Sequence, residues 1–231
     1  MGGKTFEQAV AGPARPAAKP LLPGAARHHA VAAVAVCLLV LTVQGVWIRH
    51  GMETSWVDTA VSGRIAAALG GHPRLLAVLV WPGEPAPVTA MAAALALACV
   101  LRRRYRGAAL VAISVPLAAA VTELVLKPLI GQTSWGNPFP SGHVTSAAAL
   151  ATALTVLLAG TSAGAPRLLW RVLAAAAFLV AGAVAVGVIG AQMHHLSDTV
   201  GGAAVGIGVV LATALAVDHV AGRWDAGRSG A

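Results

Sequence analysis

Long apolar runs constrain this chain more than any other feature of its sequence. A helix needs about 20 mainly apolar residues to cross a bilayer, with a range of roughly 17–25. Six runs approach or reach that length: 30–48, 85–101, 107–126, 144–159, 172–191 and 199–217. The chain is 58% hydrophobic and only 10% charged, whereas soluble domains carry roughly 25% charged residues. We therefore predict an all-α polytopic membrane protein with a six-transmembrane-helix bundle.

Two shorter apolar pieces, 56–69 and 75–81, lie between the first two runs. Neither is long enough to span a bilayer, so we expect helices that lie on or dip into the outer interface. Between these helices and the bundle we expect a lateral opening to lipid. In the sixth run, Gly202 and Gly206 form a small-xxx-small pair that favours close helix packing.

The Lys and Arg residues predict the orientation of the chain. The net charge is +8, but the basic residues sit in short clusters between apolar runs, which indicates topology signals and not a nucleic-acid surface. Twelve of the 16 Lys and Arg residues fall on alternate segments that include both ends of the chain. We therefore expect a multi-pass protein of the cell membrane with both termini cytoplasmic. The segments 49–84, 127–143 and 192–198 would then face outward.

The division of the chain follows from the same pattern. We expect a disordered cytoplasmic tail over 1–28, a membrane domain over 29–218 and a cytoplasmic C-terminal tail over 219–231. Cys37 and Cys99 both lie inside apolar runs, where they are expected to be small buried hydrophobes.

Polar residues at the ends of membrane helices are costly, so they are candidates for function. Here they come from three separate stretches at the outer ends of the third to sixth runs, with Glu123 one turn before Lys127, which brings them to one depth. That depth lies beneath the headgroups of the outer leaflet, within reach of a lipid headgroup. The candidates are Glu123, Lys127, Ser141, His143, Gln192, His194, His195 and Asp198.

Two of these segments offer groups that suit a phosphate. Lys127 precedes Pro128, which predicts that Lys127 ends its helix. Its ammonium group could bind phosphate. Alternatively, Lys127 is an interfacial lysine whose side chain reaches toward water. Ser141 and Gly142 begin the fourth run, where free backbone N–H groups form an anion site. His143 follows as a possible general acid. The plainer alternative is a capping serine followed by an incidental histidine.

The third segment contains His194 and, four residues later, Asp198. A carboxylate beside one imidazole nitrogen fixes the tautomer and leaves the other nitrogen free as a base or nucleophile. A histidine-rich exposed turn is the alternative. His195 adds a further imidazole, but a third firm ligand for a metal site is missing.

Taken in order, these residues resemble the phosphatidate phosphatase type 2 superfamily, a group of membrane lipid phosphatases related to vanadium haloperoxidases. Its pattern consists of K-x6-R-P, P-S-G-H and S-R-x5-H-x3-D. Lys127, the tetrapeptide at 140–143, and His194 with Asp198 match that pattern, and the resemblance covers about residues 30–217.

The resemblance implies a role for each matching residue. His194 would be the nucleophile that forms a phosphohistidine, and Asp198 would orient it. His143 would protonate the leaving alcohol and later activate water. Lys127 and the amides around Ser141 and Gly142 would hold the phosphate oxygens. No metal or other cofactor would be needed.

Both arginines of the family pattern are absent. Their positions fall on Ser134-Trp135 and Gly187-Val188. Hydrogen bonds to charged groups contribute roughly 1.5–3 kcal/mol each, so two lost arginines correspond to about 10²–10⁴-fold in transition-state binding. The neutral side chains that could partly substitute are Gln132, Ser134, Gln192 and His195.

Three functions remain open on the sequence. The first is hydrolysis of a lipid or polyprenyl phosphate drawn from the bilayer, on the outer face. The second is a phosphotransferase that moves a phospho-headgroup to another alcohol, since related headgroup transferases use a His-His-Asp set without the full arginine pattern. The third is a non-catalytic lipid-binding or transport protein on the same scaffold. Neither the exact lipid nor the oligomeric state follows from the sequence.

Overall fold

A computed structural model describes residues 19–51, 54–131, 139–160 and 167–229, and these contain helices but no strand. The elements in chain order are α1 (Gly24–Arg49), α2 (Trp56–Leu69), α3 (Pro73–Val80), the 3-10 turn η1 (Trp81–Gly83), α4 (Pro85–Leu101), α5 (Tyr105–Ala120), the π-helical turn η2 (Val121–Leu126), α6 (Lys127–Ile130), α7 (Gly142–Ala159), α8 (Arg167–Gly190) and α9 (Leu196–Ser229).

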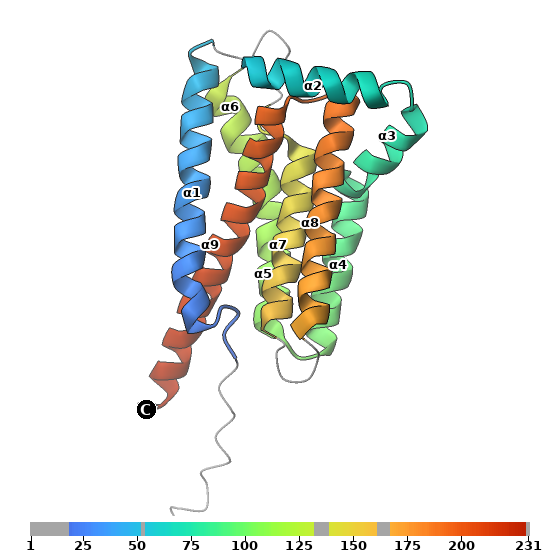
Figure 1. Ribbon diagram of the computed structural model, residues 1–231. Coiled ribbons are helices and arrows are strands. Elements are labelled where there is room, and N and C mark those ends of the chain that lie inside the picture. The colour runs from blue at the N-terminus through green and yellow to red at the C-terminus, as the bar shows by residue number, and fades with distance from the viewer. Residues whose placement is uncertain (1–18, 52–53, 132–138, 161–166, 230–231) are drawn as a thin grey trace, which may run out of the picture.

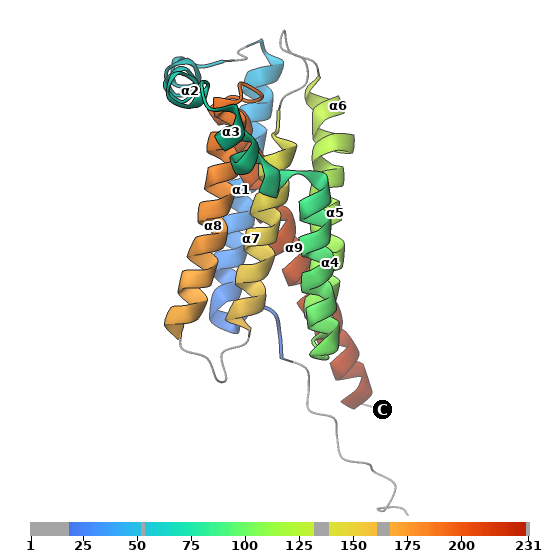
Figure 2. The ribbon, with the colours of Figure 1, turned by 90° about the vertical axis from the view of Figure 1, so that its right-hand side faces the viewer.

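The long helices form one bundle, in which α9 runs at an incline to the others (Figures 1 and 2). Within the described residues, five helices are long and apolar enough to cross a membrane: α1, the continuous stretch Tyr105–Ile130, α7, α8 and α9. The sixth expected span is α4, whose 17 residues lie at the short end of what a bilayer requires. The predicted all-α polytopic bundle is confirmed.

The helix α7 lies at the centre of the bundle and contacts α4, α5, α8 and α9. Its contact with α9 is unusually close because of Gly202 and Gly206. A Cβ atom at Gly202 would lie 2.5 Å from the carbonyl oxygen of Ser141, and one at Gly206 would lie 2.5 Å from that of Thr145. Any larger side chain would push the two helices apart, so the predicted small-xxx-small contact is confirmed.

The helices α2 and α3 lie at the end of the bundle opposite to the C-terminus (Figure 1). α2 crosses the ends of α8 and α9, and the chain bends by 120° before α3 returns toward α4. Trp56 and Trp81 are largely exposed there, as expected for side chains at a membrane interface. The expected pair of short helices is present, and together the two are apolar enough to form one broken span or a re-entrant segment.

At the other end of the bundle, the start of the described chain is bound to α9 through Asp218. The carboxylate of Asp218 accepts hydrogen bonds from the backbone N–H groups of Leu21 and Leu22, at 2.8 and 2.9 Å. Arg27 and Arg106 lie 4.0 and 3.9 Å from the same carboxylate.

Helical structure reaches into both segments that the sequence assigns to tails. Leu21 and Leu22 are buried, and α1 begins at Gly24. At the other terminus, α9 continues to Ser229. The apolar pattern gives no sign of the Asp218 contacts that hold Leu21 and Leu22 against α9.

The prediction that a helix ends at Lys127 is wrong. The helix continues through Pro128 to Ile130, and Gly131 then ends it with a φ of +92°. A π-helical turn, Val121–Leu126, immediately precedes this segment. Its wider winding accommodates a proline, which cannot donate a backbone hydrogen bond and would clash with a regular preceding turn.

The α7–α9 contact gives a direct test of the packing. We expect Gly206→Ala to lower the free energy of unfolding by about 1–3 kcal/mol, the usual cost of overpacking. Gly182→Ala in α8 is the matched control, because its new Cβ meets nothing within 4 Å and should stabilise by up to about 1 kcal/mol. Thermal unfolding in detergent measures both. Equal melting temperatures for the two variants would contradict the close approach of α7 and α9.

Candidate active site

The beginning of α7 is anchored to α9 by its backbone. The N–H of Ser141 donates to the carbonyl oxygen of Asp198 at 3.0 Å, and Ser141 itself is fully buried. Its carbonyl oxygen accepts bonds from both the N–H and the hydroxyl of Thr145. The Ser141 hydroxyl makes no capping bond, so its side chain does not occupy the free N–H groups of the first turn of α7.

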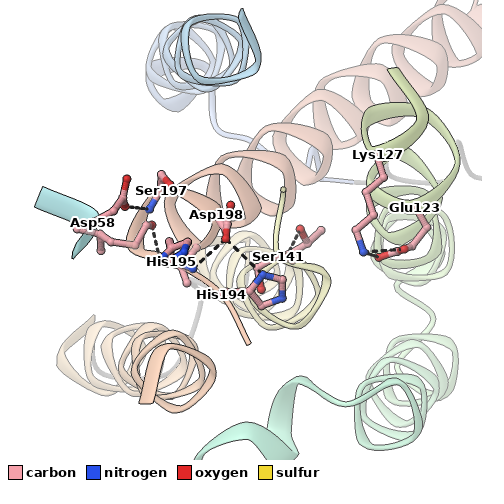
Figure 3. A network of polar contacts seen from close by, with 11 residues as sticks. Asp58, Glu123, Lys127, Ser141, His194, His195, Ser197 and Asp198 are labelled. Carbon is pink, nitrogen blue, oxygen red and sulfur yellow. Dashed lines mark hydrogen bonds and ion pairs between the residues drawn. The ribbon is translucent and has the colours of Figure 1, made fainter. Parts of the chain in front are cut away.

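His194 and Asp198 lie side by side where the α8–α9 loop enters α9 (Figure 3). Asp198 is buried, and its Oδ2 accepts a hydrogen bond from the backbone N–H of His195 at 2.8 Å. The Nδ1 atom of His194 lies 3.6 Å from the same oxygen, longer than a hydrogen bond. The carboxylate is thus fixed by the backbone and attracts His194 electrostatically, leaving Nε2 of His194 free of this contact.

His143 has a carboxylate partner that the sequence reasoning missed. Its Nε2 lies 3.5 Å from Oε1 of Glu84, the residue before α4. The approach depends on Gly83, because a Cβ there would lie 3.1 Å from the Cβ of His143 and 2.7 Å from Val184. The η1 turn therefore lies directly over the start of α7 and carries Glu84 to the imidazole.

Lys127 is paired with Glu123, one turn earlier in the same helix. The Nζ atom lies 2.7 and 2.8 Å from the two carboxylate oxygens of Glu123, and Figure 3 shows the two side chains pointing toward each other. Glu123 also reaches the start of α7, since a Cβ built on Gly142 would lie 2.8 Å from its Oε1.

A cavity of about 660 Å³ brings these groups together. Lys127, Glu123, Gly142, His143 and His194 line one end of it. The remainder runs between α4 and α5, lined by small and apolar side chains: Val88, Thr89, Ala92, Ala93, Ala96, Val111, Ala112, Val115, Pro116 and Ala119. Four residues matched to the family motifs, Lys127, Gly142, His143 and His194, thus meet at one end of an apolar slot.

Asp58 is a second carboxylate that the sequence reasoning missed. It is 4% exposed, and its Oδ1 accepts the backbone N–H of Ser197 at 2.8 Å. Its Oδ2 accepts bonds from the N–H and hydroxyl of Ser55. Burial raises the pKa of Asp58, but the hydrogen bonds from Ser197 and Ser55 together outweigh it and hold the pKa below its ordinary value. The S-x-x-D pattern at 55–58 signals a capping box, but gives no sign of the contact with Ser197.

Other expected site residues lie elsewhere. Gln192 has a φ of +57° and lines a separate cavity between α2, α3 and the end of α8. That cavity is where we expected the lateral opening, but Lys127, His143 and His194 do not line it. His195 lies on the far side of Asp198 from Lys127 (Figure 3). Ser134, Gln132 and Trp135 fall outside the described residues.

At the second position where the family pattern has an arginine, the surroundings would not readily accept a charged side chain. Val188 is fully buried and packs with Val80, Val144 and Val184 in a small apolar cluster. Of the described residues that line the catalytic cavity, Lys127 is the only permanent cation.

The described residues contain no group of three His, Cys, Asp or Glu side chains placed to hold a metal ion. The residues around the cavity instead form acid–base pairs: His194 with Asp198, His143 with Glu84, and Lys127 with Glu123. Such an arrangement can bind an anion and move protons at two imidazoles.

Comparison with protein families agrees with this geometry. Residues 122–220 match the family model of the PAP2 superfamily. This segment belongs to the PAP2 superfamily. It spans η2 to α9 and so contains Lys127, His143, His194 and Asp198. No match was found among curated proteins or among solved structures. PAP2 membership indicates a phosphoric ester hydrolase with phosphatase-type activity on lipid-like substrates.

Asp58 and Glu84 lie outside the PAP2 segment, yet both contact it. We expect Asp58→Ala to lower the free energy of unfolding by about 1–3 kcal/mol at neutral pH, because it leaves the buried partners of the carboxylate unsatisfied. Since folding lowers the pKa of Asp58, its contribution is present above the unfolded pKa of about 3.9 and is lost as the pH falls through the folded value.

The stability difference between wild type and Asp58→Ala should therefore shrink at strongly acidic pH, as followed by thermal unfolding. Arg64→Gln, an exposed change in the same helix, is the control and should stay within about 0.5 kcal/mol of wild type. A difference that is the same at pH 7 and in strong acid would show that the charge of Asp58 is not responsible.

Proposed function

We propose that the protein hydrolyses a lipid phosphate ester through a phosphohistidine on His194. The observation that carries the proposal is the cavity in which His194, His143 and Lys127 meet at the end of an apolar slot. Polar groups that converge at one end of an apolar pocket are the usual form of a binding or active site.

The two histidines take complementary roles in this reaction. Nε2 of His194 attacks phosphorus while the bond from phosphorus to the alcohol oxygen breaks, and His143 gives its proton to that oxygen. Water then attacks the phosphohistidine, His143 accepts a proton from the water, and phosphate leaves. His194 returns to its starting state, so the cycle balances without a cofactor.

The remaining groups orient and bind. Asp198 holds His194 from the Nδ1 side and stabilises the positive charge that develops on the ring. Glu84 holds His143 from the Nε2 side, so Nδ1 is the nitrogen that gives the proton to the leaving oxygen and later takes one from water. Lys127 and the free N–H groups of the first turn of α7, next to Ser141 and Gly142, hold the phosphate oxygens.

The slot between α4 and α5 supports a lipid substrate. Its lining is almost entirely aliphatic, and it starts beside the catalytic histidines. A phosphate bound at the polar end would therefore carry its hydrocarbon tail along α4, toward the middle of the bilayer. A lipid of the bilayer is the partner that fits both ends of the cavity.

The orientation of the chain follows from its Lys and Arg residues. The site lies at the end of the bundle away from the C-terminus (Figure 1), and the arginine-rich turn at 102–106 lies at the opposite end of α4 and α5. By the positive-inside rule, this arrangement supports an orientation with both termini in the cytoplasm and the site on the outer face of the cell membrane.

A headgroup transferase is the second candidate. Lys127 is the only permanent cation among the described lining residues, and a phosphodiester carries one charge fewer than a dianionic monoester. If an alcohol replaces water in the second step, the phosphoryl group moves to a second lipid. A lipid-binding or transport protein without catalysis remains a third outcome of the test below.

The nucleophile is tested with His194→Ala. We expect the variant to release phosphate at least about 10³-fold more slowly than wild type, because a missing nucleophile removes the covalent route. His72→Ala is the control, since His72 is exposed at the start of α3. Purified protein in detergent is given a panel of lipid phosphates, and inorganic phosphate and lipid products are followed together. A new phospholipid without phosphate release supports the transferase, whereas no product with either wild type or variant refutes both reactions.

The lipid slot is tested with two neighbouring alanines of α4. Ala93 lines the catalytic slot, whereas Ala94 lines a separate apolar groove between α4, α7 and α8. We expect Ala93→Phe to reduce kcat/KM for hexadecyl phosphate by at least about tenfold relative to butyl phosphate, because the ring obstructs the tail about 12 Å below the start of α4. Ala94→Phe should leave that ratio within about twofold of wild type. Equal effects of the two variants would show that the tail does not lie between α4 and α5.

A further inference from the structure

The carboxylate of Glu123 lies where the proposed function places the substrate phosphate. It is bonded through both oxygens to Lys127, at 2.7 and 2.8 Å. It also lies against the first residue of α7, within 2.8 Å of a Cβ built on Gly142. The cation and the helix N-terminus proposed to bind phosphate therefore already face an anion of the protein itself.

Glu123 changes the charge that the cavity presents to a substrate. The positive charge of Lys127 is balanced by Glu123. Among the described residues that face this pair across the cavity, none brings a further permanent cation. They are His143 with Glu84, on α7 and before α4, and His194 with Asp198, in the α8–α9 loop and α9. A bound phosphoryl group must therefore share Lys127 with a carboxylate.

We propose that Glu123 is a specificity-determining residue that selects phosphoryl groups with one negative charge over dianions. The preferred substrates are then lipid phosphodiesters, or monoesters in their singly protonated form. This inference rests on the proposed function and names the substrate class of the same site.

The physical reason is the repulsion between Glu123 and each additional charge on the phosphate. At the spacing of neighbouring groups in a partly buried site, one extra unit of like charge corresponds to at least about tenfold in binding. A phosphomonoester gains its second charge near pH 6, whereas a diester carries one charge throughout. The alternative is that Glu123 only positions Lys127, in which case its loss weakens all substrates alike.

The test uses two substrates with the same tail: dodecyl phosphate and its methyl diester. Both release dodecanol when the bond between phosphorus and the dodecyl oxygen breaks, so a single product is measured for both. The full-length protein is assayed in detergent at pH 7.5 and pH 5. The ratio of kcat/KM for monoester to diester is compared between variants, which cancels the intrinsic reactivity of each substrate and any titration of the histidines that affects both.

We expect Glu123→Gln to raise the monoester-to-diester ratio by at least about tenfold at pH 7.5. The increase should be smaller at pH 5, where the monoester carries one charge. Glu123→Asp is the matched control: it shortens the side chain but keeps the charge, so the ratio should stay close to that of wild type. If both variants reduce both substrates by the same factor, Glu123 acts only on Lys127 and the inference is overturned.

A binding measurement separates this inference from the proposed reaction. The Kd of each lipid is measured by isothermal titration with the same three proteins. The ratio of the two Kd values should shift with Glu123→Gln and not with Glu123→Asp. If wild type releases no dodecanol from either lipid, the proposed reaction is wrong and the Kd ratio alone decides the role of Glu123. An unchanged Kd ratio in Glu123→Gln contradicts the charge selection, whatever the activity.

Discussion

The close contact between α7 and α9 is the constraint on which the rest of the site depends. Gly202 and Gly206 let the two backbones approach until the carbonyl groups of Ser141 and Thr145 would touch any added side chain. At this separation the N–H of Ser141 reaches the carbonyl oxygen of Asp198. Because His143 follows Ser141 and His194 precedes Asp198 by one turn, the packing of two apolar helices sets the position of both imidazoles. In a bilayer, where apolar burial contributes little to helix association, such close packing is the main source of specificity.

Residues that precede the PAP2 match complete the polar site that the matched residues begin. Asp58 comes from α2 and supports the loop that carries His194. Glu84 lies between η1 and α4 and contacts His143. A carboxylate beside an imidazole helps to fix its orientation and tautomer. The family match therefore contains most of the polar site but lacks two of its carboxylates.

The sequence predicts the spans well because the bilayer imposes a length on them. The predicted run 85–101 has the same limits as α4, and Lys127, His143 and His194 do line one cavity. The errors occur where distant residues decide the local structure. Asp58 contacts Ser197 across 139 positions of the chain, and no local pattern reports such a pair. Lys127 was expected at a helix end because of Pro128, but a π-helical turn accommodates the proline. Gln192 adopts a positive φ, which directs this part of the loop toward another cavity.

The loss of the two family arginines has a counterpart in the rest of the site. Val188 stands among Val80, Val144 and Val184 in a cluster without polar groups, so an arginine there would require a different packing of α8 against α7. The absence of an arginine at this position is therefore matched by its surroundings, because the neighbouring side chains are apolar as well. Within the cavity, Glu123 pairs with Lys127 and balances its charge. The apolar packing around Val188 and the pairing of Lys127 both leave the proposed phosphate position less positive than two arginines would. Such a site suits a phosphoryl group with one negative charge better than the dianion that two arginines would bind.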